Sequence, residues 1–228
     1  VKATSGALAC GARSVAATAA TAPVPSAVSH TRRDLGLADL PVDEVIVHVG
    51  CGARYLLEHA VAETDRPYDD LWRIFIGHYA EHCCEKLVPY PGMLETLDAL
   101  AAAGWRLGVN TNKPSFAVKL ILEKFGLERL FGAAVVAGGD GVPLKPDPAS
   151  ICECAARLGG WRLSARDWMV GDSWTDMRCA EAAGVNGAFC EFGFGRLDDA
   201  PCAARLSCFG DLAAVVGEGK VNQVEGAQ

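Results

Sequence analysis

The sequence has a deficit of positive charge, no long apolar run and no zinc-type cysteine motif. Lys and Arg number 21 against 28 Asp and Glu, which gives a net charge of −7. The longest basic cluster is Arg32-Arg33, so neither nucleic acid nor an anionic membrane is expected as a partner. No apolar stretch reaches the roughly 20 residues of a membrane span. The negative net charge is still compatible with a small anionic ligand, because an acidic protein can contain a local positively charged site.

The cysteines do not form a disulfide or zinc framework. Ten are present, and they include the adjacent pair Cys83-Cys84 and the pair Cys152-x-Cys154. Neither pair is the C-x-x-C of a zinc site, and disulfide scaffolds are typical of short secreted chains. We therefore predict reduced, mostly buried thiols in a cytoplasmic protein. His78 and His82, four apart near Cys83, lack further ligands at suitable spacing, which favours a partly exposed helix face over a metal site.

Acidic residues are missing from the start of the chain. The first 33 residues contain no Asp or Glu, and 12–29 is nearly all Ala, Thr, Ser, Val and Pro. This composition resembles a transit peptide, although no amphipathic Arg-rich helix is visible. The alternative is a disordered or wrongly translated segment. The polar tail after Gly217 is expected to fray.

From Trp105 onward, segments typical of strands alternate with segments typical of helices. The predicted strands are 105–110, 133–137, 168–170 and 186–190, and the predicted helices are 114–125, one opening at Asp147-Pro148, and 175–183. This alternation predicts a parallel, doubly wound α/β sheet. Residues 38–90 differ, because helical spacing dominates there, with helices predicted at 42–48, 53–62 and 68–87. The 228 residues suffice for one α/β core and a small helical domain.

Candidate chemistry follows the predicted strands, because ligands of open α/β sheets bind beyond the carboxyl ends of the strands. Asp172 and Asp176 lie four apart at a helix start, where they could hold Mg²⁺ through carboxylate oxygens. Helix capping explains the same pair equally well. Thr111 could bind a phosphoryl oxygen or cap a helix. Lys145 could offset negative charge in the site or be a solvated turn lysine.

The order Thr, Lys, Asp-x-x-x-Asp resembles motifs II to IV of the haloacid dehalogenase-like (HAD) superfamily, and the chain is most similar to phosphoglycolate phosphatases from about Leu35 to Leu212. The segments that carry the closer resemblance are Val49-Gly-Cys-Gly-Ala-Arg54, Pro89-Tyr-Pro-Gly92, Thr111-Asn-Lys-Pro114, Lys145-Pro-Asp-Pro148 and Gly171-Asp-Ser173. The resemblance implies a Rossmann-like core formed by 1–15 and 91–217, an inserted helical cap at 16–90 and a disordered tail at 218–228.

The resemblance also implies a function and a set of site residues. It implies a Mg²⁺-dependent phosphatase of small phosphorylated metabolites such as 2-phosphoglycolate, acting as a monomer or homodimer through an aspartyl-phosphate. Thr111 and Asn112 would hold the phosphoryl group, Lys145 would neutralise charge, and Asp172 would ligate Mg²⁺ with help from Asp176. Gly52 and Arg54 would belong to the cap face that meets the substrate. Other chemistries of the superfamily are mutase, phosphonatase and dehalogenase reactions, and the last needs no metal.

One motif of the family is missing. The Asp-x-Asp-Gly-Thr motif, whose first aspartate is the nucleophile, should fall near Gly11 to Ser14, where the sequence reads Gly-Ala-Arg-Ser. This mismatch suggests a locally shifted reading frame, with Val1-Lys-Ala3 as a remnant of the first strand. Without the aspartate the covalent route is closed, and a protein that binds Mg²⁺ and a phosphorylated ligand without turnover is the alternative.

Overall fold

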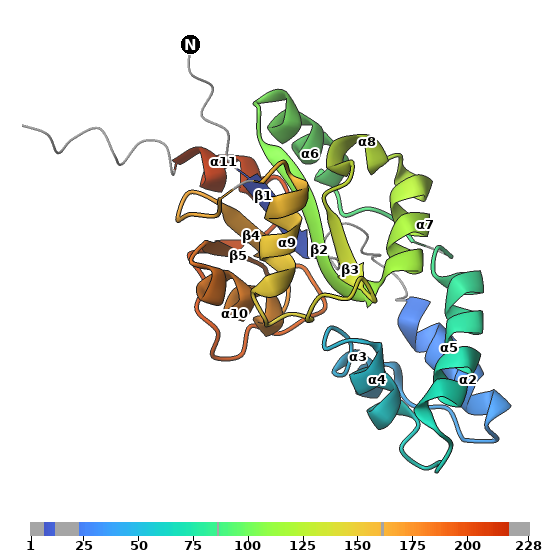
Figure 1. Ribbon diagram of the computed structural model, residues 1–228. Coiled ribbons are helices and arrows are strands. Elements are labelled where there is room, and N and C mark those ends of the chain that lie inside the picture. Colours follow the sequence, from blue (N-terminus) through green and yellow to red (C-terminus); the bar gives the residue numbers. More distant parts are fainter. Residues whose placement is uncertain (1–6, 12–22, 86, 161, 219–228) are drawn as a thin grey trace, which may run out of the picture.

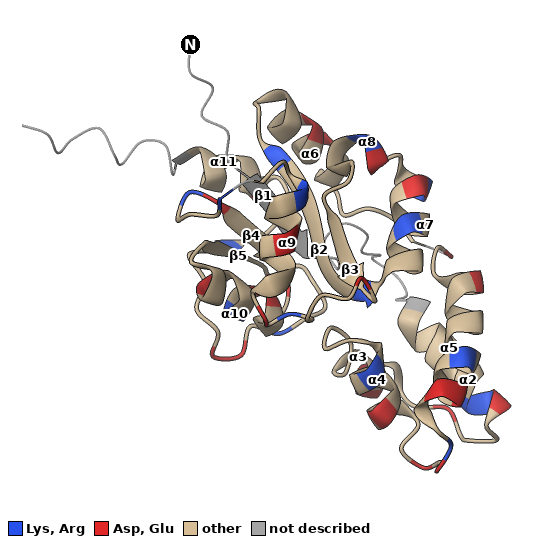
Figure 2. Ribbon diagram, in the orientation of Figure 1, with Lys and Arg blue, Asp and Glu red and all other residues tan. Residues whose placement is uncertain are grey.

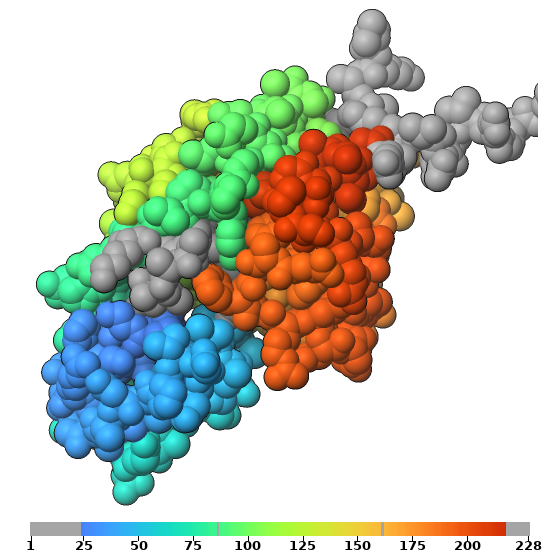
Figure 3. Space-filling view, turned by 180° about the vertical axis from the view of Figure 1, so that it is seen from behind, coloured from blue at the N-terminus to red at the C-terminus, as the bar shows by residue number. Residues whose placement is uncertain are grey.

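A computed structural model describes residues 7–11, 23–85, 87–160 and 162–218; for 7–11, 23 and 218 the description covers the backbone alone. The chain forms a sheet-containing unit and a smaller helical unit beside it (Figure 1). The space-filling view from behind shows the helical unit as a separate lobe next to the sheet unit (Figure 3).

The sheet unit is built on parallel strands, as the alternating sequence pattern predicted. Within the described residues the strand order is β3-β2-β1-β4-β5-β6, and every pairing is parallel. The strands are β1 (Ala7–Gly11), β2 (Arg106–Pro114), β3 (Val135–Gly138), β4 (Trp168–Gly171), β5 (Asn186–Cys190) and β6 (Ala204–Leu206). The first strand therefore lies in the middle of the sheet at 7–11, whereas its predicted remnant, Val1-Lys-Ala3, lies outside the described residues.

Helices cover both faces of the sheet because side chains alternate along each strand. In β4, Trp168 and Val170 join a cluster with α6 (Met93–Ala102), α7 (Ser115–Phe125), α8 (Glu128–Phe131) and α11 (Asp211–Glu218). Met169 points to the opposite face and packs with α9 (Ala149–Arg157) and α10 (Trp174–Ala183). Burial on both faces explains why these strands are apolar runs in the sequence.

The helical unit has a hydrophobic cluster of its own. It consists of α2 (Pro23–Asp34), α3 (Val42–Ile46), α4 (Ala53–Ala60) and α5 (Tyr68–His82). Helix α2 lies along α5 and buries Val24, Ala27 and Val28. The prediction of disorder for the segment up to residue 29 is therefore wrong from Pro23 onward. This helix was not predicted from the sequence, because the residues on its buried face are small and also occur in flexible segments.

Arg32 fixes the end of α2 to the rest of the helical unit. Its side chain is buried and donates hydrogen bonds to the backbone oxygens of Ala38 and Ala60 and to the carboxylate of Glu63. The ion pair holds the pKa of Glu63 below its usual value, mainly through the hydrogen bond from Arg32. Of the two residues in the basic cluster Arg32-Arg33, Arg32 therefore has a structural role, and only Arg33 is exposed to solvent.

Several boundaries differ from those expected. Strand β2 continues to Pro114, so that α7 begins at Ser115, and α9 begins at Ala149 rather than at Asp147-Pro148. Helix α5 ends at His82, five residues before its predicted end. Helices α6, α8 and α11 and strand β6 were not predicted. Residues 219–228 of the expected tail lie outside the described residues.

Both signs of charge are mixed along the helices, as Figure 2 shows on α5, α7 and α8. None of the helices in the described ranges combines the length and the apolar character needed to cross a membrane.

Candidate functional site

A pocket lies where the carboxyl ends of the central strands face the helical unit. Its cavity volume is about 70 Å³. The sheet unit supplies its polar lining and the helical unit most of its apolar lining. The lining comprises Val24, Val49, Gly50, Gly52, Ala53, Leu56, Phe75, Tyr79, Thr111, Asn112, Lys113, Pro114, Lys145, Asp172, Ser173, Thr175 and Asp176. The three segments singled out at predicted strand ends thus meet in one place.

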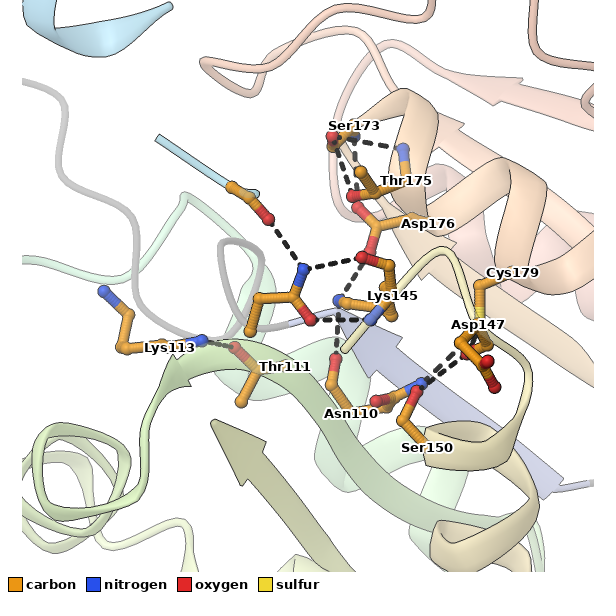
Figure 4. Close-up of polar contacts among 12 residues, drawn as sticks. Asn110, Thr111, Lys113, Lys145, Asp147, Ser150, Ser173, Thr175, Asp176 and Cys179 are labelled. Atoms are coloured by element: carbon orange, nitrogen blue, oxygen red, sulfur yellow. Dashed lines mark hydrogen bonds and ion pairs between the residues drawn. The ribbon is translucent and has the colours of Figure 1, made fainter. Parts of the chain in front are cut away.

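Lys145 and Asp176 form the centre of the polar wall. The Lys145 ammonium donates to Asp176 Oδ1 at 2.6 Å and to the backbone oxygen of Asn110, in the middle of β2, at 2.8 Å (Figure 4). Both side chains are buried. Lys145 is therefore held in the site, and the alternative of a solvated turn lysine is wrong.

Asp176 also belongs to a capping box at the start of α10. Its Oδ2 accepts from the backbone N–H of Ser173, while the Ser173 hydroxyl oxygen accepts from the N–H of Thr175. A Cβ at Gly171 would lie 2.2 Å from Asp176 Oδ2, so the carboxylate needs glycine at the end of β4. The capping explanation is confirmed for this aspartate, which also lines the pocket, and its part in holding Mg²⁺ stays a prediction.

Asp172 is fixed by the loop that follows β5. Its Oδ2 accepts the backbone N–H groups of Phe194 at 2.8 Å and Gly195 at 3.0 Å. A Cβ at Gly195 would lie 2.2 Å from the backbone oxygen of Asp172. The loop thus needs glycine to approach closely enough for its amides to orient the carboxylate.

Thr111 and Asn112 end the buried part of β2. The Thr111 hydroxyl oxygen accepts the backbone N–H of Lys113 at 2.9 Å, and its proton can be donated elsewhere. The Asn112 amide nitrogen donates to the backbone oxygens of Gly50 and Lys145, and its oxygen accepts from the N–H of Lys145. Asn112 therefore connects the loop before α4, the end of β2 and the lysine.

Of the two site residues predicted in the helical unit, Gly52 lines the pocket and Arg54 does not. Gly52 lines the pocket with a φ of 96°, and a Cβ there would lie 2.6 Å from Leu144 Cδ1. Arg54 is absent from the pocket lining. Its guanidinium stacks 3.7 Å from the ring centre of Tyr68, and 63% of its side-chain area is exposed. A substrate contact from Arg54 would require its guanidinium to leave Tyr68.

Lys113 is a pocket residue to which the sequence reading gave no role of its own. Its ammonium donates to the hydroxyl of Tyr79, on α5, at 2.6 Å. It is thus a direct polar contact between the sheet unit and the helical unit. The sequence contained its signal only in part, since Lys113 stands in the Thr111-Asn-Lys-Pro114 segment while its partner lies 34 residues away.

The other polar candidates lie outside the pocket. Asp147, at the predicted start of this helix, accepts the N–H of Ala149 at the start of α9. His78 contacts the carboxylate of Asp34, and His82 contacts that of Glu85. The Glu85 carboxylate raises the pKa of His82, chiefly through this hydrogen bond.

The carboxylates of the pocket suit one kind of metal ion. Among the described side chains, no group of three or more His, Cys, Asp and Glu is placed to hold a metal ion. Zinc needs three or four such ligands, but Mg²⁺ is commonly bound by one or two carboxylates together with waters and phosphate oxygens. Asp172 and Asp176 fit the second pattern.

The fold and the pocket define a Rossmann-like α/β protein with acidic and basic groups gathered at the carboxyl ends of its strands. Within this class, the chain belongs to the haloacid dehalogenase-like hydrolases, whose family pattern matches residues 21–190. It is 39% identical to a phosphoglycolate phosphatase of Agrobacterium fabrum over 178 residues, which cover 76% of this chain and 75% of the relative. It is 36% identical to that of Rhodospirillum rubrum over 204 residues, covering 84% and 83% of the two chains.

A solved structure supports the same assignment. The chain superposes on the crystal structure of a predicted phosphoglycolate phosphatase of Haemophilus somnus with a TM-score of 0.80 at 25% identity, covering 92% of this chain and 97% of the other. The predicted resemblance is confirmed. The family match begins at residue 21, so it leaves out β1 and the segment where the nucleophile was expected.

Proposed function

We propose that this pocket is the site of a Mg²⁺-dependent phosphatase that acts on small phosphate monoesters such as 2-phosphoglycolate. The observation that carries the proposal is the convergence of Thr111, Lys145, Asp172 and Asp176 in one largely buried pocket. The relatives named phosphoglycolate phosphatase support the choice of substrate class. The small cavity suits a metabolite of this size.

Each polar side chain of the pocket has a different role in the proposed binding of a phosphoryl group. Thr111 donates its hydroxyl proton to a phosphoryl oxygen, and the Lys145 ammonium offsets the negative charge gathered in the pocket. Asp172 would hold Mg²⁺, with Asp176 beside it. The bound ion would supply further positive charge to the phosphoryl oxygens. Asn112 keeps Lys145 and the Gly50 loop in place.

The helical unit takes the part of the family's cap domain. Its residues Val24, Gly52, Leu56 and Phe75 face the polar wall across the pocket. An apolar cover excludes water and strengthens the electrostatic interactions beneath it. We place the cap at 16–90 and the core at 1–15 and 91–217.

A second candidate function is binding without turnover, and one observation favours it for this chain. In the family an aspartate after the first strand attacks phosphorus, but residues 1–33 contain no Asp or Glu. Strand β1 ends at Gly11, followed by Ala12, Arg13 and Ser14. No carboxylate of this segment can form the aspartyl-phosphate.

Phosphate release from 2-phosphoglycolate by the purified chain, with and without Mg²⁺, separates the two functions. Turnover that disappears without Mg²⁺ and in Asp172→Asn supports the phosphatase and excludes a contaminant. Absence of turnover in a folded chain supports the second candidate. The double variant Ala12→Asp/Ser14→Asp then restores an Asp-x-Asp. Turnover gained by this variant, and lost again with Asp172→Asn, would show that the remaining site is complete, whereas its failure would count against the phosphatase proposal.

A further inference from the structure

Lys113 differs electrostatically from the other charged residues of the pocket. Four charged side chains line it in the described part of the chain: Lys113, Lys145, Asp172 and Asp176. Asp176 compensates Lys145 directly, and backbone amides hold Asp172. No acidic side chain among the described residues pairs with Lys113, whose polar contacts are the neutral Tyr79 hydroxyl and, through its backbone N–H, Thr111.

Lys113 also lies apart from the phosphoryl-binding groups. In Figure 4 its side chain points away from the Lys145–Asp176 pair. Thr111 and Lys113 are two residues apart on β2, in the stretch between Asn110 and Pro114 where the pairing with β3 shifts register. Because both residues line the same pocket, a small ligand with its phosphate at Thr111 can place a second charged group, one or two carbon atoms further on, near Lys113.

The surroundings of Lys113 make its charge effective. Tyr79 and Phe75 belong to the buried cluster of the helical unit, and the Lys113 ammonium lies 5.4 Å from the Tyr79 ring centre. Apolar neighbours screen charge less than water does, so an anion here interacts strongly with an uncompensated ammonium. The Tyr79 hydroxyl oxygen accepts a hydrogen bond from the ammonium, and the hydroxyl can donate its own proton in a hydrogen bond to the same anion.

We propose that Lys113, held by Tyr79, is a specificity-determining residue that binds a second anionic group of the substrate, namely a carboxylate one carbon away from the phosphate ester. The inference rests on the proposed phosphate site and adds to it a selection among phosphate monoesters. Lys113 selects short carboxylated phosphates over neutral ones of the same length. Tyr79 acts as a positioning residue, because it fixes the ammonium from across the pocket.

Binding to the full chain tests this inference without requiring turnover. Calorimetric titrations with Mg²⁺ present would compare 2-phosphoglycolate, ethyl phosphate and inorganic phosphate. We expect 2-phosphoglycolate to bind roughly tenfold or more tightly than ethyl phosphate, as is typical of one charge-assisted hydrogen bond. Lys113→Met should abolish this preference and leave inorganic phosphate affinity within about twofold. Lys113→Arg should keep most of the preference, and Tyr79→Phe should reduce it without changing inorganic phosphate affinity.

Lys119→Met is the matched control, since it removes the same charge from an exposed position on α7. It should change none of the three affinities. A preference that survives Lys113→Met, or that is absent from the parent chain although inorganic phosphate binds, would overturn the role of Lys113 and leave the phosphate site standing. Failure of all three ligands to bind the folded chain would overturn the proposed function together with this inference.

Discussion

Lys145 and Asp176 form a buried ion pair in which the ammonium nitrogen lies 2.6 Å from Oδ1, with side-chain exposures of 5% and 4%. The lysine follows β3 and the aspartate lies in the first turn of α10, so that the pair connects two loops at the edge of the sheet. The remaining oxygen of the aspartate and the backbone oxygen of Asn110 complete the hydrogen bonding around it. The pair that we propose to take part in ligand binding is therefore also expected to stabilise the fold.

Removing one partner of this pair should be costly, because the other charge is then buried alone. We expect Asp176→Asn or Lys145→Met to lower the free energy of unfolding by about 3–5 kcal/mol. The double variant should be less destabilised than the sum of the singles by roughly 1–3 kcal/mol. Urea unfolding of the four proteins measures this cycle, and strictly additive effects would contradict the coupling.

The close approach of Gly171 to Asp176 predicts a second effect. In Gly171→Ala the new Cβ would lie 2.2 Å from Oδ2. We expect a loss of about 1–3 kcal/mol from overpacking, together with weaker binding of inorganic phosphate. Gly210→Ala is the control, since the nearest atom to its Cβ, Cys208 Sγ, is 3.7 Å away. Equal effects of the two variants on phosphate binding would argue against a displaced carboxylate.

Helix α5 contains a glycine that the structure does not need. Gly77 is exposed in mid-helix, and a Cβ there would meet no atom within 4 Å. Gly77→Ala should raise the free energy of unfolding by about 0.5–1 kcal/mol, because alanine loses less backbone entropy on folding. Gly126→Ala should act in the opposite direction, since that residue ends α7 with a φ of 63°. Thermal unfolding midpoints that moved in one direction for both variants would contradict this explanation.

The buried cysteines should react more slowly with alkylating reagents than the exposed ones. Burial raises the pKa of Cys154 to about 12 and that of Cys179 to about 11, so both thiols stay neutral in neutral solution. The Cys154 thiol therefore contains very little of the reactive thiolate form even at pH 8. Mass spectrometry after iodoacetamide treatment should find Cys152 and Cys208, which are exposed, labelled first. Denaturant should remove the difference, and early labelling of Cys154 in the folded chain would contradict its burial.

Much of the sheet was predictable because strand ends carry local signals. Strand β5 was predicted to the residue, since Gly184 ends the helix before it and its apolar run is buried on both faces. Following such strand ends also identified Thr111, Lys145, Asp172 and Asp176. By contrast, β6 has three residues, too few for a recognisable period. Helix α6 was not predicted although its buried Met93, Leu97 and Leu100 have helical spacing, because Pro89 and Pro91 predict only the point where the chain returns to the core.

The contacts between the two units could not be predicted in this way. Whether Lys113 meets Tyr79 depends on how α5 packs against the end of β2, which no local pattern encodes. Arg54 was expected at the pocket because of the family resemblance of 49–54, but its stacking on Tyr68 depends on the packing within the helical unit. Both outcomes are determined by tertiary packing rather than by the periodicity of a segment.

The position of β1 in the sheet and the proposed reaction depend on different parts of the chain. Its pairing with β2 and β4 involves main-chain groups, which nearly any sequence can supply. The strand can therefore keep the middle of the sheet closed whatever side chains follow it. Under the proposed function, a few codon changes just beyond Gly11 could therefore remove or restore the catalytic aspartate during evolution without changing the pairing of β1 within the sheet.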